Sequence, residues 1–232
     1  MPNTDDKFRI GHRDRLRQKF TDGKLNEVEQ LELLLTFAIP RRDVRPLARQ
    51  LIQEFGNVYH VLHAETDVLL RVPGIGQSTV LLLRLVHSLI CINHKNILGD
   101  KSMYMAQDTL VDYCRAKMSG LSKEEFHVLY LDSNMCMVED ELHSRGGIES
   151  TNVYYDRIVA RAINKSYKAV LLLHNHPTTD NTFSTTDIDV TRKLEFALNL
   201  CGIQLYDHFV VAGGIVHSMR NERILDKKLS QS

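Results

Sequence analysis

The 232-residue sequence has no long apolar run and no clustered cysteines. None of its hydrophobic stretches approaches the roughly 20 residues that span a bilayer. Its first ten residues, MPNTDDKFRI, lack the apolar core of a secretory signal peptide. The four cysteines (Cys91, Cys114, Cys136 and Cys201) are scattered and form no CxxC pair. We therefore expect a cytoplasmic protein with reduced thiols and no membrane attachment.

An excess of charge of one sign is also absent, because 29 Lys and Arg balance 29 Asp and Glu. The two halves of the chain differ, however. Residues 1–95 carry 14 basic and 11 acidic side chains, a net +3, and residues 96–232 carry 15 and 18, a net −3. The mildly basic first half is only a weak indication of an anionic partner.

The sequence does contain enough apolar residues, 43%, for a folded core. Its first half has helical periodicity in successive segments, at residues 9–20, 26–39, 43–56, 57–72 and 73–92. Asn26 and Glu29 have capping-box spacing, and Pro40 and Gly56 mark helix ends. We predict a small helical domain over residues 1–95, followed by a linker over residues 96–104, where the sequence is polar and has no sustained period.

The second half alternates between strand and helix patterns. Strands are predicted at residues 124–133, 135–147, 168–177, 203–214 and 215–219, and helices at 109–120, 153–166 and 185–202. This order predicts an α/β (α+β) domain with two or three layers over residues 105–232.

The predicted strand LLLHNHP, residues 171–177, ends in two histidines. Side chains two residues apart on a strand point to the same side, so His174 and His176 can reach one point in space. Two imidazoles and one carboxylate are a known catalytic zinc set, and Asp187 could supply the oxygen. The segment STTD also fits an ordinary helix start, with Ser184 as the cap and Asp187 in the first turn. The spacing alone leaves both interpretations open.

The motif HNHP, followed by Ser184 and Asp187, resembles the JAMM motif of JAB/MPN metalloproteases, written E…HxH(P)…SxxD. The whole chain more narrowly resembles the bacterial RadC family. The strands YLDSNMCMVEDELHSRGGIEST and LYDHFVVAGG and the helical segments ELLLTFAI and VPGIGQSTVLLLRL share this resemblance. It implies a JAB/MPN-type, cytidine-deaminase-like mixed sheet behind a helix-hairpin-helix-like region.

The resemblance also implies the site. His174, His176 and Asp187 would bind one Zn²⁺ per chain, and Ser184 would donate a hydrogen bond to the developing oxyanion. The glutamate of the motif would be Glu124, acting as general base, with Glu125 as the alternative. The implied activity is that of a zinc metallohydrolase, a metallopeptidase or isopeptidase acting on a protein or peptide.

Some residues depart from the family pattern or lie near the motif. The loop at residues 178–183 keeps its length but lacks the Ser-Gly and the prolines usual in relatives, which bears on efficiency and specificity. His208 matches a histidine of the family, and we interpret it as a satisfied strand residue rather than a ligand. Four further polar residues, Asp180, His127, His143 and His217, are assigned to the surface or the surroundings of the site.

The segment VPGIGQSTV predicts a second feature. In helix-hairpin-helix modules, a turn such as Gly74-Ile75-Gly76 lets backbone N–H groups at a helix start meet a phosphate. The basic helix that contains Arg13 and Arg17 would add to DNA binding. A tight turn between two packed helices explains the same residues equally well.

Three functions from different classes follow. The first is the zinc hydrolase. The second is a DNA-binding, repair-related protein or metal-dependent nuclease. The third is a noncatalytic JAB scaffold, against which the presence of all three ligand residues argues. Neither the substrate nor the oligomeric state follows from the sequence.

Overall fold

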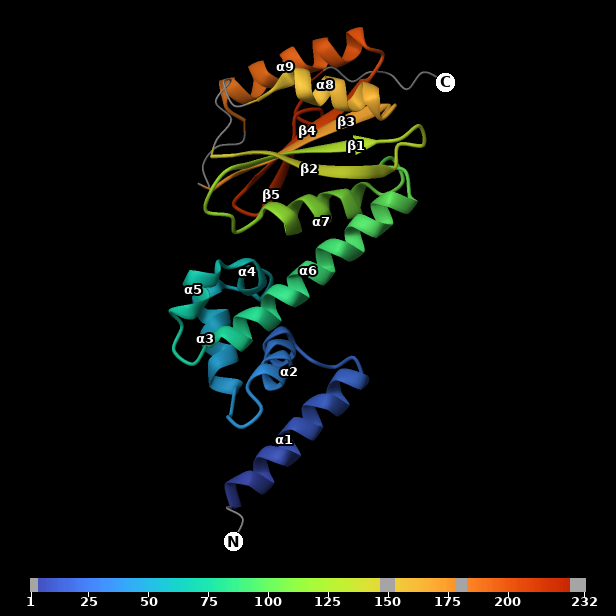
Figure 1. Cartoon of the computed structure of the whole chain (residues 1–232). Coiled ribbons are helices and arrows are strands. Elements are labelled where there is room, and N and C mark those ends of the chain that lie inside the picture. Colours follow the sequence, from blue (N-terminus) through green and yellow to red (C-terminus); the bar gives the residue numbers. More distant parts are fainter. Residues whose placement is uncertain (1–3, 147–152, 178–182, 226–232) are drawn as a thin grey trace. The chain divides into compact units, whose positions relative to one another are not determined.

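The computed structural model describes residues 4–146, 153–177 and 183–225, with side chains described from residue 11 onward (Figure 1). The chain divides into two compact units, residues 1–88 and 89–232. The first unit is helical and the second is built around a β-sheet.

The first unit contains the helices α1 (Thr4–Thr21), α2 (Glu27–Ala38), α3 (Arg45–Phe55), α4 (Val58–His63), α5 (Thr66–Leu70) and the start of α6 (Gln77–Asp100). The predicted capping box is present, because the Asn26 side chain accepts a bond from Glu29 N and the Glu29 carboxylate accepts one from Asn26 N. Gly56 ends α3 with a φ of +91°, which glycine adopts readily. Leucines fill the core, among them Leu31, Leu35, Leu51, Leu69 and Leu83.

The predicted linker differs from the structure. Helix α6 continues to Asp100, so residues 96–100 are helical, and only residues 101–106 connect α6 to α7 (Gln107–Met118). The physical reason is Leu98, which is fully buried in one core cluster with Met103 and Leu110. The burial of Leu98 thus stabilises the last turn of α6, whose other residues are mostly polar.

The second unit contains a five-stranded mixed sheet in the order β2-β1-β3-β4-β5. Its strands are β1 (Glu125–Leu131), β2 (Met137–Arg145), β3 (Ala169–His176), β4 (Gln204–Ala212) and β5 (Ile215–Ser218). Only β3 and β4 are parallel, and helix α9 (Thr185–Leu200) connects them. Helix α8 (Tyr155–Asn164) lies between β2 and β3 in the sequence. The predicted mixed α/β class is confirmed.

Both faces of the sheet are covered, which makes three layers. Leu171 and Leu173 belong to the core cluster on the α7 side, whereas Val170 and Leu172 belong to the cluster on the side of α8 and α9. Figure 1 shows α7 on one side of the strands and α8 with α9 on the other. The alternation along β3 therefore predicts where its polar end points: residues 174 and 176 face α9, and residue 175 faces the α7 side.

None of the helices in the described ranges has the length and apolarity needed to cross a membrane.

Candidate metal centre

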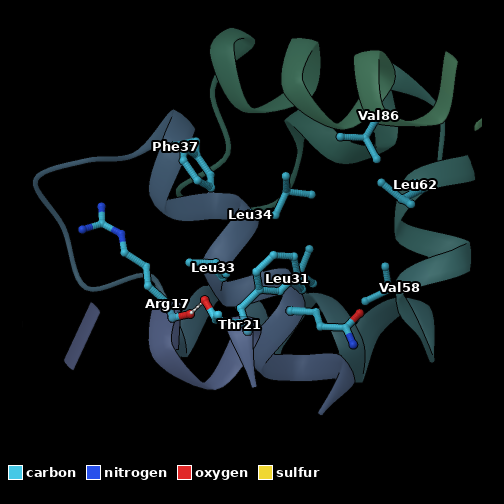
Figure 2. Close-up of a pocket in the computed structure, with 11 residues that line it drawn as sticks. Arg17, Thr21, Leu31, Leu33, Leu34, Phe37, Val58, Leu62 and Val86 are labelled. Atoms are coloured by element: carbon cyan, nitrogen blue, oxygen red, sulfur yellow. Dashed lines mark hydrogen bonds between the residues drawn. The ribbon is translucent and has the colours of Figure 1, made fainter. Parts of the chain in front are cut away.

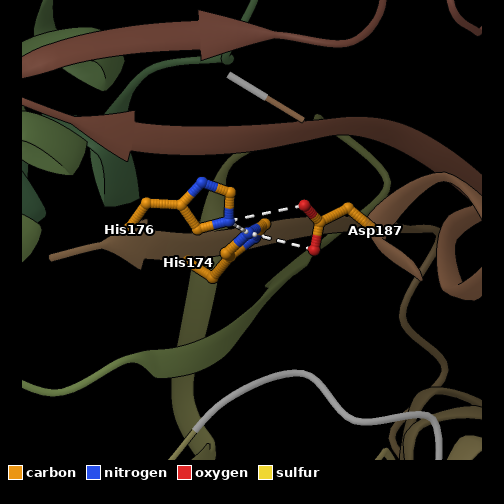
Figure 3. A group of neighbouring side chains, drawn as sticks. All are labelled: His174, His176 and Asp187. Carbon is orange, nitrogen blue, oxygen red and sulfur yellow. Dashed lines mark hydrogen bonds and ion pairs between the residues drawn. The ribbon is translucent and has the colours of Figure 1, made fainter. Parts of the chain in front are cut away.

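Three side chains meet where β3 ends and α9 begins (Figure 3). His174 Nε2 lies 3.0 Å from His176 Nε2 and 3.3 Å from Asp187 Oδ1, and His176 Nε2 lies 3.4 Å from Asp187 Oδ2. Among the described residues, these three are the group whose ligand atoms all lie within 4.8 Å of one another. The side-chain alternation of β3 and the short path into α9 bring them together.

Asp187 takes part both in the capping box at the start of α9 and in the cluster with the histidines. Ser184 is the N-cap of α9: its Oγ accepts a bond from Asp187 N at 3.1 Å, and Asp187 Oδ2 accepts one from Ser184 N at 2.7 Å. The other carboxylate oxygen, Oδ1, faces His174. The helix start and the approach to the histidines therefore occur together, although the sequence presented them as alternatives.

Burial and hydrogen bonding fix the charges of the cluster. Burial alone would raise the pKa of Asp187, but the neighbouring His174 and His176 outweigh it and hold this pKa well below its usual value. Burial lowers the pKa of the fully buried His174 despite the nearby carboxylate. The cluster is thus an anionic oxygen beside an imidazole that favours its neutral form, which is the state in which both bind cations.

The spacing of the three donors suits a small tetrahedral cation. Ligands that lie 2.0–2.1 Å from a tetrahedral zinc are about 3.3 Å from one another. The separations of 3.0, 3.3 and 3.4 Å match that edge length. Two nitrogens and one oxygen are also the donor set of zinc hydrolases that keep an open coordination position.

His208 and Thr191 contact residues of the cluster, and the sequence did not predict these contacts. His208, fully buried in β4, lies with Nε2 2.8 Å from His174 Nδ1. The other nitrogen of His208 contacts the hydroxyl of Thr191 in α9. Burial, and next the neighbouring His174, hold the pKa of His208 well below its usual value. His208 is thus a satisfied strand residue, as expected, and it also contacts the candidate ligand His174.

Glu124 and Glu125 lie next to each other at the start of β1. Glu125 begins β1, and its carboxylate contacts Arg145 Nε at 2.9 Å and His127 Nε2 at 3.1 Å. Glu124 directly precedes the strand, and strand alternation predicts that it shares the face of Phe126, which pairs with His174 across the ladder. Among the groups that act on the pKa of His174, after burial and the contributions of Asp187 and His176, is the charge of Glu124. The geometry therefore favours Glu124 over Glu125 as the carboxylate of the site.

Asn175, between the two histidines, contacts the segment that carries Glu124. Its Nδ2 donates to Lys123 O at 3.1 Å and to Leu121 O at 3.4 Å, and its Oδ1 accepts from Glu125 N at 2.8 Å. Only 2% of Asn175 is exposed. One buried carboxamide thus fixes the backbone on both sides of Glu124, a role that no local sequence signal indicates.

A second group of charged side chains lies on the α7 side of the sheet. The buried Asp140 of β2 contacts Lys117 Nζ at 2.8 Å, His127 Nδ1 at 2.9 Å and the hydroxyl of Tyr113. These bonds join α7 to two strands, so we assign the group to stability. His143 accepts a bond from Tyr154 N, and His217 pairs with Glu222. Asp180 and residues 178–182 of the altered loop lie outside the described residues.

The turn at residues 74–76 is well formed in the first unit. Gly74 has a φ of +96°, and a Cβ at Gly76 would meet nothing within 4 Å. Ile75 is buried. Arg13 donates to Ile39 O, Pro40 O and Arg42 O, so its guanidinium holds the loop after α2. Arg17 is exposed and pairs with Asp14 at 3.2 Å.

The first unit also has an apolar hollow of about 720 Å³ (Figure 2). Its lining comes from α1, α2, α4 and α6 and includes Leu34, Phe37, Leu62 and Val86, with Arg17 on the side of α1. An apolar lining suits a hydrophobic segment better than a phosphate backbone.

Comparison with known proteins identifies a family for the part of the chain that contains His174, His176 and Asp187. A model of the RadC-like JAB domain matches residues 104–224. A UPF0758 protein of Ruegeria pomeroyi is 35% identical over 217 residues, which cover 92% of this chain and 97% of that protein. A JAB fold is compatible with a metal-dependent hydrolase, and the His174, His176 and Asp187 cluster is compatible with a metal. By both comparisons, the chain belongs to the RadC-like JAB family.

Proposed function

We propose that the protein is a zinc-dependent hydrolase that cleaves amide bonds in a peptide or isopeptide substrate. One observation carries this proposal: His174, His176 and Asp187 converge at the spacing of a tetrahedral zinc site. Peptide substrates follow from the resemblance to JAMM metalloproteases, which the three ligands and Ser184 support.

Each residue of the site has a defined task in such a reaction. When bound, zinc lowers the pKa of a water molecule and polarises a carbonyl oxygen. The Glu124 carboxylate can take a proton from the attacking water and deliver it to the departing amine. The Ser184 hydroxyl accepts the capping bond from Asp187 N, and its own hydrogen can donate to the oxygen that becomes negative.

Metal content and cleavage, measured on the same variants, test the proposal. Wild-type protein purified without chelators should contain about one zinc per chain, and the double substitution His174→Ala/His176→Ala should remove the metal while the fold survives. Glu124→Gln should keep the zinc and lose most turnover on a peptide or isopeptide library, because the proton acceptor is lost and the ligands remain. Glu125→Gln is the matched control, since its carboxylate contacts Arg145 and His127 on the other face.

The outcomes separate the remaining functions. Protein that neither carries zinc nor takes it up would contradict the metal site. Cleavage of single-stranded or duplex DNA without cleavage of any peptide would make the protein a nuclease. Zinc binding without turnover on either substrate class would make it a noncatalytic scaffold.

We also propose DNA as a second ligand, bound by the first unit. The observation in favour is the open glycine turn before α6, where Arg42 lies 3.8 Å from the Cβ position of Gly74. A backbone phosphate could approach Gly76, because no side chain lies there. Arg13 is a weaker candidate than the sequence indicated, since it holds the loop after α2.

Fluorescence anisotropy with the full chain and duplex or branched DNA at low salt tests this second proposal. Gly76→Ala should fold normally and bind more weakly, and Arg17→Ala should reduce the salt dependence of binding. Gly99→Ala is the control, at a helical position in the second unit. No binding by the wild type would leave the first unit as a module for protein contacts.

A further inference from the structure

A series of hydrogen bonds connects His174 to Asp187 through His208 and Thr191, apart from the direct contact between the two side chains. His174 Nδ1 contacts His208 Nε2 at 2.8 Å. His208 Nδ1 contacts Thr191 Oγ1, and Thr191 Oγ1 contacts the backbone carbonyl of Asp187. All of these side chains are buried: His174, Thr191 and His208 have no exposed surface and Asp187 has 1%.

The backbone carbonyl of Asp187, at the end of this series, determines which atom donates in each hydrogen bond. A carbonyl oxygen only accepts, so the Thr191 hydroxyl donates to Asp187 O and its oxygen accepts from His208 Nδ1–H. A neutral imidazole carries a single proton, on one of its two nitrogens. With that proton on Nδ1, His208 Nε2 must accept, and His174 must carry its own proton on Nδ1. His174 Nε2 then carries no proton and accepts from His176 Nε2, which lies 3.0 Å away.

We propose that Thr191 and His208 are positioning residues that hold His174 in the tautomer protonated on Nδ1, leaving Nε2 ready for a cation. The role of the cation rests on the function proposed above. The tautomer itself is a property of the chain without any ion. Metal-binding histidines are commonly oriented through their second nitrogen, and loss of the outer partner typically costs about tenfold to a hundredfold in metal affinity.

The same series of hydrogen bonds also joins three elements of secondary structure. His174 ends β3, His208 lies in the parallel neighbour β4, and Thr191 and Asp187 lie one turn apart in α9. The two ligands are therefore connected on the cluster side through Asp187 Oδ1 and on the outer side through His208 and Thr191.

Side-chain NMR of the metal-free full-length protein tests the tautomer directly. In ¹⁵N-histidine-labelled wild type, long-range ¹H–¹⁵N spectra should show His174 protonated on Nδ1, with His174→Gln used to assign its signals. In Thr191→Val, His208 loses its acceptor, so His174 should gain population protonated on Nε2. Thr191→Ser, which restores the hydroxyl, should restore the wild-type spectrum. A wild-type His174 protonated on Nε2 would overturn the proposal.

Zinc affinity, measured by competition with a chromophoric chelator, is the second readout. Thr191→Val should bind zinc about tenfold to a hundredfold more weakly, as should His208→Leu. Thr191→Ser should stay close to wild type, and so should His208→Gln, whose amide oxygen can accept from His174. Thr36→Val is the matched control, because it removes a buried hydroxyl that donates to Leu33 O at 2.6 Å in the other unit.

The two readouts distinguish this proposal from the metal site itself. If wild-type protein binds no zinc, the proposed function fails, while the spectra still decide the tautomer. If Thr191→Val keeps both the wild-type affinity and the wild-type His174 signals, Thr191 and His208 only fill space and the proposal is wrong. Should His208→Leu not fold, Thr191→Val and Thr191→Ser give the same decision.

Discussion

Neighbouring residues at the end of β3 act on different faces of the sheet. His174 and His176 meet Asp187, whereas Asn175 bonds to the segment before β1. Strand alternation and helix capping are local, so they could predict that His174 and His176 share a side and that Asp187 lies in the first turn of a helix, whereas the resemblance to JAMM proteins was needed to predict that the three meet. The partners of Asn175 and His208 could not be predicted, since they depend on which strands become neighbours in the sheet.

Replacing Asn175 should change turnover without removing the metal. Asn175→Asp keeps the acceptor for Glu125 N but loses both bonds to Leu121 O and Lys123 O and faces these carbonyls with a negative charge. Glu124 should then be misplaced, which lowers kcat by about tenfold to a hundredfold, the cost of a misplacement of about 1 Å. Zinc content should stay at the wild-type value.

Asn134→Asp is the control for this substitution, because it adds the same charge at an exposed turn. Equal kcat for Asn175→Asp and wild type, measured on any substrate that the library yields, would show that the carboxamide does not position Glu124.

At the scale of elements, the contacts of Asp140 join α7 to the sheet. Lys117 and Tyr113 of α7 and His127 of β1 all contact this carboxylate of β2. Burial would raise the pKa of Asp140, but the bonds from His127 and Lys117 outweigh it and hold the pKa well below its usual value. The extent of α7, β1 and β2 followed from sequence periodicity, whereas this cross-element network did not.

The pKa of Asp140 predicts a loss of stability in acid. A carboxyl whose pKa is lower in the folded chain contributes its full stabilisation above the unfolded pKa of about 3.9, and this contribution is lost progressively as the pH falls from that value toward the folded pKa. Asp140→Asn should lower the free energy of unfolding at pH 7 by about 1–3 kcal/mol. The difference from wild type should shrink below about pH 4.

Urea unfolding of the second unit between pH 3 and 7 measures this effect. Asp112→Asn is the control, because its carboxylate is exposed and pairs within α7 with Arg115. A constant gap between Asp140→Asn and wild type over the whole range would contradict the low pKa of Asp140.

The whole molecule consists of two units with separate cores. The clusters around β3 belong to residues 89–232, and the leucine core of α2, α3, α5 and α6 belongs to residues 1–88. The helical character of the first half and the α/β character of the second could be predicted from periodicity. The helical structure of residues 96–100 could not be predicted, because it depends on the burial of one leucine, Leu98, within a polar sequence that has no helical periodicity.

Zinc should therefore stabilise one unit selectively. A ligand that binds only the folded state adds RT ln(1 + [L]/Kd) to its stability, about 2.7 kcal/mol when free zinc is 100 times Kd. We expect zinc to raise the melting temperature of the second unit and to leave the first unchanged. Scanning calorimetry with and without zinc, with Asp187→Ala as the variant that cannot respond, measures both transitions. An equal shift of the two transitions would contradict a site confined to the second unit.

The shared role of Asp187 has an evolutionary consequence. Asp187 Oδ2 accepts the bond from Ser184 N and lies 3.4 Å from His176 Nε2, while Oδ1 lies 3.3 Å from His174 Nε2, so asparagine could keep the bond from Ser184 N while removing the negative charge from the cluster. Aspartate and asparagine codons differ by a single nucleotide. A descendant of this chain could thus lose the anionic member of the candidate metal centre in one mutational step while its fold, and any partner that recognises the fold, persists.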